Sequence, residues 1–450
     1  MANVIKLRKG LDINLKGKAA EDKVAPGLTD DFALVPDDFP GVVPKVIVRE
    51  GDHVLAGQPL FADKINSNVS FASPVSGKVT AVERGERRKV LAVKIVADAR
   101  QEYVDFGVRE VSELTGDEVI EALLHAGLFG YINQLPYAVS ASPSVHPKAI
   151  FVSAFRDMPL ACSFEFELKG NEKDFQTGLT VLSRVEKTWL NIGIHQQSQA
   201  LRTAKNVELH IFDGPCPAGN VGVQINHLCP VNKGEVIWTV DPTTVIFIGR
   251  LFNTGKVDLR RTIALAGSGI TRPAYMDVKV GMSLGAILEG NMVRSDHVRI
   301  INGNPLTGRR VLDHAYLGAH TSEVTVIPEG DNVHEMLGWI MPRFKQFSTS
   351  RSYFTWLFGK SKEYDLDARI KGGERHMIMS GEYDRVIPMD IYAGYLIKAI
   401  ITGDIDKQEQ LGIYEVSPED FALAEFVDSS KLPLQKIVRD GLNLLRKENA

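Results

Sequence analysis

Short stretches of alternating apolar and polar residues fill the first hundred positions, and Gly turns separate them. Val54 and Leu60 lie in two such stretches after the Gly51-Asp52 turn, and residues 90–96 form another. Successive side chains of a strand point to opposite faces, so this period of two predicts strands with one buried face. The pattern therefore predicts a small all-β domain that closes near residue 100.

A mixed helix and strand pattern follows. Thr115 and Glu118 have the spacing of a capping box, which marks the start of a helix. Three short apolar, β-branched runs then predict strands: residues 149–154, 207–212 and 245–248. Strands separated by helical stretches are typical of an α/β domain, which we expect over residues 101–255.

Strand signals dominate the next part of the chain and helical signals the last part. Apolar runs between Gly and Asn turns predict strands at residues 263–266, 298–301 and 323–327. Apolar residues recur at helical spacing from Pro388 to Gly403 and again over residues 434–445. We therefore expect four domains: a barrel with an N-terminal arm at 1–100, the α/β domain at 101–255, a β-rich domain at 256–330 and a helical domain at 331–450.

Composition narrows the classes of function. The 450 residues include 44% hydrophobic residues, as in ordinary globular proteins, and 52 basic against 56 acidic side chains. This balance gives no global attraction to nucleic acid. Three cysteines are too few for a disulfide framework and fit a reducing cytoplasm. No signal peptide and no apolar run of about 18 residues is present, so we expect neither secretion nor a transmembrane segment.

Two stretches that look like phosphate or metal sites lack the required spacing. Five residues separate Gly249 from Gly255, where a phosphate-binding loop has four. We interpret this stretch as a tight strand-to-loop turn. Cys216, His227 and Cys229 are three soft ligands, but structural zinc usually takes four in short paired spacings. We expect ordinary buried or turn residues there, and no metal.

Residues 336–362 contain five basic residues, many aromatic ones and no acidic one. Aromatic rings beside basic side chains suit a protein interface or the lipid headgroup layer. The other interpretation is that the rings fill the core of a helical domain and the basic residues surround it. The candidates for partner or membrane docking are Trp339, Arg343, Phe344, Phe347, Tyr353 and Trp356.

Residues 41–82 resemble the flattened barrel that holds biotin or lipoate in swinging-arm enzymes. In the lipoyl pattern the modified lysine lies seven residues after the leucine that matches Leu60. Here Lys64 follows after four. The resemblance therefore implies a biotinyl/lipoyl-like barrel without the usual attachment lysine.

A second resemblance covers nearly the whole chain and rests on collinear motifs. These are residues 57–64, 84–88, 217–219, 263–267, 341–342, 347–348, 381–390 and 412–415. They resemble the A subunit of the sodium-translocating NADH:quinone reductase, a family related to the C subunit of the Rnf complex and to the FMN-binding subunit of complex I. The resemblance implies an α/β domain like the FMN-binding subunit of complex I, together with a small β-grasp-like domain and a helical C-terminal domain like a ferredoxin.

Three cofactor motifs of the related subunits are altered here. Their glycine-rich flavin loop corresponds to residues 130–137, where only Gly130 remains and bulky side chains should exclude a flavin phosphate. Their acidic Glu-Cys-Glu-Pro corresponds to residues 156–159, which begin with Arg156. The cysteines of their second cluster motif align with Phe421, Ala424, Asp428 and Ser429, which offer iron no thiolate.

The resemblance implies a peripheral subunit of a complex that oxidises NADH, reduces quinone and translocates sodium ions, at the cytoplasmic face of the bacterial inner membrane. It implies that this chain has no catalytic residue and binds no cofactor. NADH, FAD, FMN, riboflavin and the Fe-S cluster then belong to partner subunits, among which the membrane-embedded B subunit is the chief contact. Assembly and quinone access are the roles left to this chain.

A quinone head is flat and apolar with two acceptor oxygens, so its site needs aromatic walls and a few donors. Residues of these types lie at the altered flavin loop: Phe129, Tyr131, Gln134, Pro136 and Tyr137. Two other functions remain open. One is a flavin- and NADH-binding electron-transfer subunit of the Rnf type, and the other is a free-standing biotinyl or lipoyl carrier protein.

Overall fold

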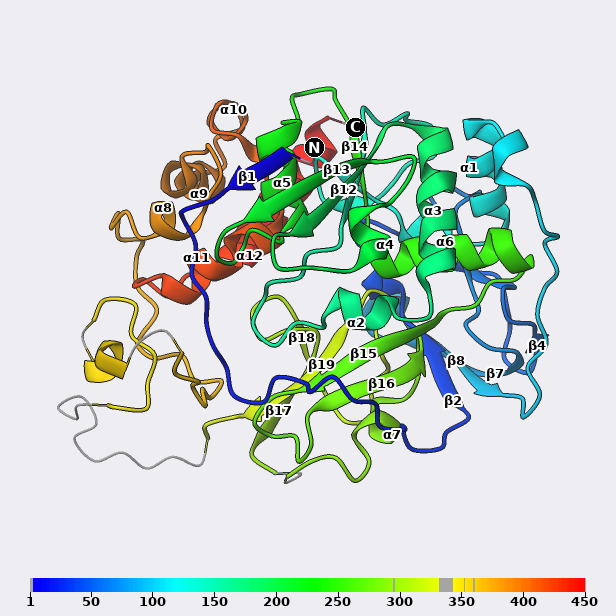
Figure 1. The fold of residues 1–450 in the computed structure, drawn as a ribbon, viewed down its shortest axis with the longest axis horizontal. Helices are drawn as coiled ribbons and strands as arrows, with labels where there is room; N and C mark the ends of the chain where they lie inside the picture. Colours follow the sequence, from blue (N-terminus) through cyan, green and yellow to red (C-terminus); the bar gives the residue numbers. More distant parts are fainter. Residues whose placement is uncertain (1–2, 294–295, 332–342, 352, 359–360, 450) are drawn as a thin grey trace.

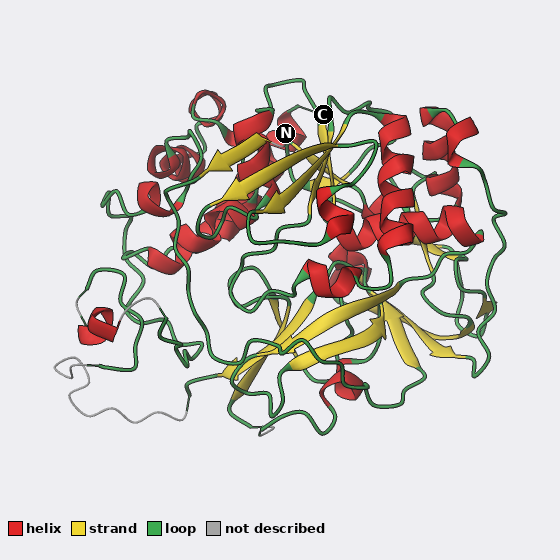
Figure 2. Ribbon diagram, viewed as in Figure 1, coloured by secondary structure: helices red, strands yellow, loops and turns green. Residues whose placement is uncertain are grey.

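The computed structural model describes residues 3–293, 296–331, 343–351, 353–358 and 361–449. Two large sheets lie one above the other in Figure 1, with the barrel strands at the lower right and the C-terminal helices at the left. Figure 2 separates the helices from the strands in the same view. Within the described ranges, no helix is both long enough and apolar enough to cross a membrane.

The upper sheet has seven strands in the order β1-β13-β12-β11-β14-β9-β10. They are β1 (Asn3–Lys6), β9 (Asn133–Leu135), β10 (Val139–Ser140), β11 (Ile150–Ser153), β12 (Thr188–Gly193), β13 (Glu208–Asp213) and β14 (Ile237–Val240). The first five in this spatial order are parallel, and β9 and β10 are antiparallel additions at one edge. The strands predicted at 149–154 and 207–212 are confirmed, whereas the residues expected as an arm of the barrel form edge strand β1.

Helices cover both faces of this sheet. On β11, Ile150 packs in one cluster with Leu179 of α3 (Glu172–Val185) and Val245 of α6 (Pro242–Thr254). The next residue, Phe151, packs in another cluster with Ile225 of α5 (Val221–Leu228). Since neighbouring strand residues point to opposite faces, α3 and α6 lie on one face and α5 on the other. The α/β region also contains the helices α1 (Gly116–His125), α2 (Phe164–Leu168) and α4 (Gln199–Arg202). The predicted capping box stands at the start of α1.

The strand predicted at 245–248 is wrong, because these residues lie inside α6. The Asp241 side chain accepts the Thr243 N–H and caps the helix, and Pro242 occupies its first turn. This start signal outweighs the strand preference of the apolar run. The predicted strand-to-loop turn after Gly249 is wrong for the same reason, since Gly249 is helical and Gly255 ends the helix in the left-handed conformation.

The N-terminal region is a barrel of two small sheets. One has the order β2-β8-β7-β4, with β2 (Asp31–Leu34), β4 (His53–Val54), β7 (Gly77–Arg84) and β8 (Val90–Ala97), and the other joins β3 (Pro44–Val46), β5 (Pro59–Asp63) and β6 (Ser70–Ala72). The predicted strand at 90–96 is confirmed. Gly77 is required by a close approach, because a Cβ there would lie 2.1 Å from the Val96 carbonyl oxygen.

The lower sheet has five strands in the order β16-β15-β19-β17-β18. They are β15 (Arg260–Ala266), β16 (Ala274–Lys279), β17 (Val298–Asn302), β18 (Arg309–Val311) and β19 (Glu323–Pro328), with the short helix α7 (Leu284–Leu288) after β16. All three strands predicted in this part of the chain are confirmed.

Helices α8 (Tyr383–Val386), α9 (Ala393–Thr402), α10 (Ile405–Gln410), α11 (Ala422–Val427) and α12 (Leu434–Glu448) form the C-terminal region. The predicted helix at 434–445 is confirmed. The other predicted helix ends as expected at Gly403, in the left-handed conformation, but α9 begins only at Ala393. The prediction of its start at Pro388 is therefore wrong.

One hydrophobic core joins the barrel, the upper sheet and the lower sheet. Leu60 and Phe71 of the barrel belong to the same buried cluster as Val152 of β11 and Ile263 of β15. The C-terminal helices have a separate cluster that reaches Phe212 of β13. Because the first three regions share a core, they hold one another in fixed positions, and polar groups between them keep a defined geometry.

Candidate functional site

A cavity of about 560 Å³, here called the central cavity, lies at the carboxyl ends of β11 and β14. Arg156 and Asp157 follow β11 on its wall, and Asp241 follows β14. The chain continues from β11 to β12 on one side, whereas β14 lies on the other side of β11. In open α/β sheets such a reversal of strand order leaves a crevice in which ligands commonly bind.

The other regions of the chain complete the wall of the central cavity. Asp38 comes from the barrel, Asn304 and Glu323 from the lower sheet, and Glu419 and Arg439 from the C-terminal helices. Every region of the fold therefore contributes an ionisable side chain to the wall of this cavity.

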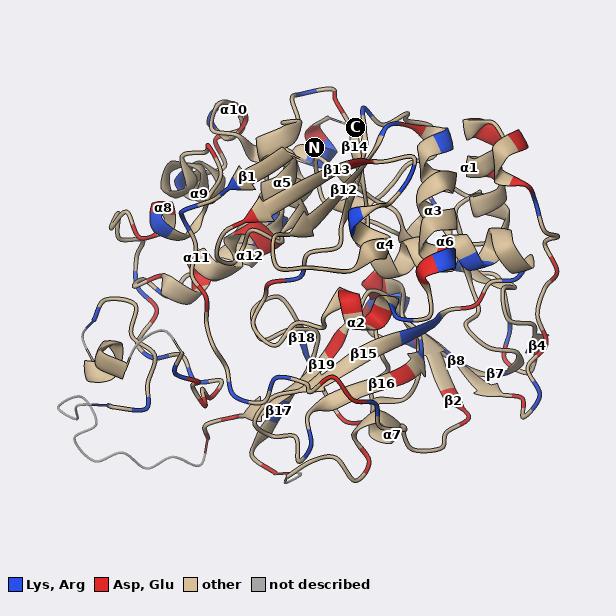
Figure 3. Ribbon diagram, in the orientation of Figure 1, with Lys and Arg blue, Asp and Glu red and all other residues tan. Residues whose placement is uncertain are grey.

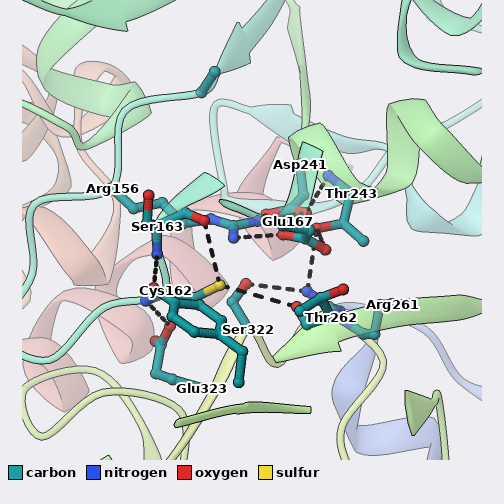
Figure 4. A network of polar contacts seen from close by, with 12 residues as sticks. Arg156, Cys162, Ser163, Glu167, Asp241, Thr243, Arg261, Thr262, Ser322 and Glu323 are labelled. Carbon is teal, nitrogen blue, oxygen red and sulfur yellow. Dashed lines mark hydrogen bonds and ion pairs between the residues drawn. The ribbon is translucent and has the colours of Figure 1, made fainter. Parts of the chain in front are cut away.

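A buried network of polar contacts forms one side of the cavity (Figure 4). The Arg156 guanidinium donates to Glu167 Oε2 at 2.8 Å and to Thr243 Oγ1 at 3.0 Å, and it lies 3.4 Å from both oxygens of Asp241. The Thr243 hydroxyl donates in turn to Glu167 Oε1 at 2.9 Å. Glu167 lies on α2, which stands between the two large sheets in Figure 1. The network therefore fixes α2 to the start of α6.

Arg261 of β15 extends the network to the lower sheet. Its guanidinium donates to Ser322 Oγ at 3.0 Å, to the Ala319 carbonyl at 3.1 Å and to Thr243 Oγ1 at 3.3 Å. The Cys162 N–H donates to Glu323 Oε2 at 3.0 Å, at the start of β19. Figure 4 shows these side chains meeting between the sheets.

Charge pairing decides the protonation of the network. Burial opposes the charge on Asp241, but the attraction of Arg156 and Arg261 holds its pKa below the usual range. Burial likewise opposes the charge on Arg156, yet Asp241 and Glu167 raise its pKa. Both groups are therefore charged at neutral pH, and removing Arg156 leaves the buried Glu167 without its ion-pair partner.

Two other carboxyl groups of the cavity have a raised pKa. Burial raises the pKa of Asp157 to about 7, although Asp157 Oδ2 accepts the Gly219 N–H at 2.8 Å. Burial, followed by repulsion from Asp420, also raises the pKa of Glu419, and the attraction of Arg439 offsets only part of this rise. The cavity therefore contains carboxyl groups that hold protons at much higher pH than a solvated carboxyl group does.

The N-termini of α5 and α6 lie at the cavity, and carboxyl groups of the chain already occupy them. Asp241 caps α6. Asp157 binds the Gly219 N–H just before α5, and a Cβ added to Gly222 in the first turn of α5 would lie 2.4 Å from an Asp420 oxygen. A helix N-terminus is the usual position for a bound phosphate, so side chains already fill these positions.

The residues predicted for a quinone site lie beside the cavity but are not brought together in it. Phe129, Tyr131 and Pro136 are buried, and Gln134 and Tyr137 are half-buried. The part of this loop that lines the cavity is instead Asn133, Leu135 and Ala138.

Local contacts explain where three of these side chains lie. The Tyr131 ring packs 5.1 Å from the Phe39 ring, and burial raises the pKa of its hydroxyl, for which no hydrogen-bond partner is present among the described residues. Gln134 accepts the Ser142 N–H at 2.9 Å. The Tyr137 hydroxyl accepts from Asn449 at 3.2 Å, just after α12.

Among the residues predicted for docking, Trp339 lies outside the described residues. Phe344 and Trp356 are each 49% exposed, and Phe354, Leu357 and Phe358 beside them are also exposed. Tyr353 and Arg343 are half-buried, with the guanidinium 5.9 Å from the ring centroid. Phe347 instead packs on Tyr364 and Phe426. The segment thus has both exposed rings and one ring that anchors it to the C-terminal helices.

The positions aligned with cluster cysteines are largely filled. Phe421 and Ala424 are buried, and Ser429 is half-buried. The Asp428 carboxylate accepts the Ser430 N–H at 3.0 Å and the Leu432 N–H at 2.8 Å, so it organises the turn before α12. Among the described residues, no three His, Cys, Asp or Glu side chains are placed to hold a metal ion.

Sequence patterns barely indicate the network and the central cavity. Asp241 before Pro242 is a helix-start signal that could have located one member. Glu167, Arg261, Glu323 and Glu419 come from separate elements, and no motif joins them in the sequence.

Comparisons with known proteins agree along the chain. Three family models match: "NqrA N-terminal barrel-sandwich hybrid domain" at residues 5–98, "NqrA second alpha/beta domain" at 114–257 and "NQRA C-terminal domain" at 262–313. The A subunit of the Na(+)-translocating NADH-quinone reductase of Yersinia pestis bv. Antiqua (strain Angola) is 34% identical over 450 residues, which cover 99% of this chain and 100% of that one. The same subunit of Neisseria meningitidis serogroup A is 34% identical over 452 residues, with the same coverage.

A solved NAD+-reducing NiFe hydrogenase in the air-oxidized state has a TM-score of 0.36 and 11% identity, and the match covers 77% of this chain and 67% of that one. A likeness this distant supports no conclusion about the chain.

Arg156→Ala should lower the free energy of unfolding by about 3–5 kcal/mol, because Glu167 then stays buried, and Asp241 half-buried, without this cation. Denaturant titration of the full chain measures the change. Arg100→Ala, which removes an exposed arginine, should change it by no more than about 0.5 kcal/mol. Equal stability of the two variants would contradict the role of the network.

Asp157 should make the chain less stable as pH rises from about 4 to about 7. In this window the unfolded carboxyl group has lost its proton and the folded one retains it, so the folded state binds more protons and stability falls with pH. Asp157→Asn keeps an oxygen for the Gly219 N–H and should be more stable than the parent chain by about 2–4 kcal/mol at pH 8, but not at pH 4.

Chemical unfolding at a series of pH values tests this expectation, and Asp365→Asn, at an exposed position, is the matched control. If the difference between Asp157→Asn and the parent chain did not depend on pH, the burial of a protonated Asp157 would be contradicted.

Proposed function

The chain belongs to the family of the A subunit of the Na(+)-translocating NADH-quinone reductase, and from this membership we propose that it is a peripheral subunit without a redox group of its own. The complex is a sodium-pumping NADH:quinone oxidoreductase, so the chain is a subunit of a translocase. We place it at the cytoplasmic face of the bacterial inner membrane, with the membrane-embedded B subunit as its chief neighbour. One observation carries the proposal: Asp157, Asp241 and Asp420 occupy the N-termini of α5 and α6, where a phosphate would bind.

The flavin loop supports this proposal, because its residues do not fit a flavin phosphate. A Cβ on Gly130 would lie 2.3 Å from the Phe71 ring, so this glycine is needed for packing against the barrel. Tyr131 is buried beside it. The N-termini of α5 and α6, the other usual phosphate positions, face Asp420 and Asp241. Anionic phosphate would meet carboxylates at both helices.

An iron–sulfur cluster is equally unsupported by the residues present. Cys162 and Cys216 are buried, and burial raises the pKa of each thiol, which disfavours the thiolate that iron requires. Asp428 serves the turn where a cluster ligand would be needed. Electron transfer within the complex is therefore assigned to the other subunits.

The role proposed for this chain is assembly, together with quinone access beside the Gly130–Tyr137 loop. Exposed Phe344, Trp356 and their neighbours supply an apolar docking surface with basic residues around it. Aromatic residues and arginine are enriched at protein interfaces, which suits contact with a membrane subunit. Half-buried Gln134 and Tyr137 supply a donor and an aromatic wall for a quinone head.

A tagged copy of the chain, expressed in its host and purified from solubilised membranes, should bring with it the integral membrane subunits and NADH:quinone reductase activity. The Phe344→Ala/Trp356→Ala variant should bind them at least about 30-fold more weakly, since buried aromatic residues at interfaces often contribute about 2 kcal/mol or more. Leu28→Ala, at a fully exposed residue, is the control. Purification of the parent chain without membrane subunits would refute membership of an assembled complex.

In the intact complex, Tyr137→Ala should raise the KM for quinone about tenfold, which corresponds to about 1.4 kcal/mol of lost binding. Steady-state kinetics with varied quinone measure the effect. Asn449→Ala removes the donor to the Tyr137 hydroxyl and controls for loss of the contact beside α12. An unchanged KM in Tyr137→Ala would end the proposal of quinone access at this loop.

A further inference from the structure

Carboxyl groups outnumber cationic groups on the wall of the central cavity. The carboxyl groups are those of Asp38, Asp157, Asp241, Glu323 and Glu419, and the cations are Arg156 and Arg439. Arg156 is bound to Glu167 and Asp241, and Arg439 donates to the Tyr137 carbonyl at 2.8 Å. Within the described residues, no ion pair reaches the Asp157, Glu323 or Glu419 carboxyl group.

Several buried polar atoms on this wall have no hydrogen-bond partner among the described residues. Asp157 Oδ1 and Asn133 Oδ1 are buried without a hydrogen-bond partner, and so is His320 Nε2. Burial lowers the pKa of His320 to about 4, so its ring adds no positive charge at neutral pH. A buried polar atom without a partner costs about 1–3 kcal/mol, so a ligand that brings N–H donors would remove a real penalty.

Among the carboxyl groups on the wall, Glu419 is the one most available to a ligand. Its carboxyl group has no hydrogen bond with the described residues, although Arg439 attracts it, and it is half-buried on the cavity wall. Asp420, the next residue, is bound by Ser417 and Asn220, so it does not depend on Glu419. The Glu419 carboxyl group is therefore available to a ligand in the cavity.

The side chains on the cavity wall favour one class of ligand. An anion is disfavoured because Asp157, Asp241 and Asp420 already occupy the N-termini of α5 and α6. A single metal ion is disfavoured because, among the described residues, no three ligating side chains converge. An organic cation with several N–H donors on an apolar stem fits better, since Leu135, Met158 and Val240 supply apolar wall beside the carboxyl groups. The volume of about 560 Å³ lies within the range of about 300–1,000 Å³ for ligand pockets.

We propose that the central cavity receives a lysine or arginine side chain from another subunit of the complex. The proposal rests on the proposed function, because it is the assembled complex that supplies the partner chain. The partner's ammonium or guanidinium group lies against Glu419 and Asp157, and its stem lies along the apolar wall. The cavity is thus a binding site for this partner side chain, here called the socket, and it stabilises the contact between the chain and its neighbour.

The test measures assembly of the full chain with the complex purified from a strain that lacks this chain. Isothermal titration calorimetry at pH 7, in buffers of different ionisation enthalpy, gives both the Kd and the number of protons released. Glu419→Gln should weaken binding about tenfold or more, reduce its salt dependence and abolish part of the proton release. Glu121→Gln removes an exposed carboxylate on α1 and should behave as the parent chain does.

Glu419→Lys supplies a cation from within the chain and should weaken binding further, because it fills the socket. Thermal unfolding of each variant separates this effect from misfolding, and Glu419→Gln should unfold at or above the temperature of the parent chain.

The proposed membership of the complex and the proposed socket would be refuted by different results. If the parent chain did not bind the depleted complex, membership of an assembled complex would fail, and the socket with it. If the parent chain bound but Glu419→Gln bound equally well, with the same salt dependence and proton release, the socket alone would be refuted. Stoichiometric binding of spermidine by the assembled complex, lost in Glu419→Gln, would assign the cavity to a free cation and would also refute the socket.

Discussion

The buried guanidinium of Arg156 is the constraint on which the arrangement of the molecule depends. It pairs with Glu167 on α2 and with Asp241 at the start of α6, and Thr243 links this pair to Arg261 of the lower sheet. A buried charge that loses its partner is expensive, so these elements remain together only in one relative placement. The shared hydrophobic core holds the regions together, and the network fixes the position of the two large sheets relative to each other. The central cavity keeps its shape because one of its sides is this network.

The same electrostatics support the proposal that this chain holds neither a flavin phosphate nor an iron–sulfur cluster. Asp241 and Asp157 bind the N–H groups at which a phosphate would bind, and Asp428 binds two N–H groups where a cluster would need thiolates. Basic and acidic positions are mixed throughout the fold (Figure 3), so the excess of carboxyl groups in the cavity is a local feature. In the function that we propose, the chain contributes binding and positioning to the complex, and electron transfer takes place on its neighbours.

Local patterns predict most of the elements, and tertiary contacts decide the rest. The capping box at Thr115, the strand at 149–154 and the terminal helix at 434–445 follow from short-range rules that the structure obeys. The apolar, β-branched run at 245–248 predicts a strand, yet the cap at Asp241 makes it helical. The site is harder to predict. The sequence identifies the bulky loop at 130–137, but only the structure shows that Phe71 of the barrel needs Gly130 for packing. The partners of Arg156 lie 11 and 85 residues away, and no sequence rule pairs them.

This chain's own side chains are proposed to occupy the positions where its cofactor-binding relatives hold their redox groups. The flavin and iron content of the full chain tests this directly, once the chain is released from the purified complex under native conditions and then denatured for fluorescence and metal analysis. We expect neither flavin nor iron in stoichiometric amount in the released chain, with both recovered in the remaining subunits. One flavin or one iron–sulfur cluster for each released chain would contradict the proposed occupancy.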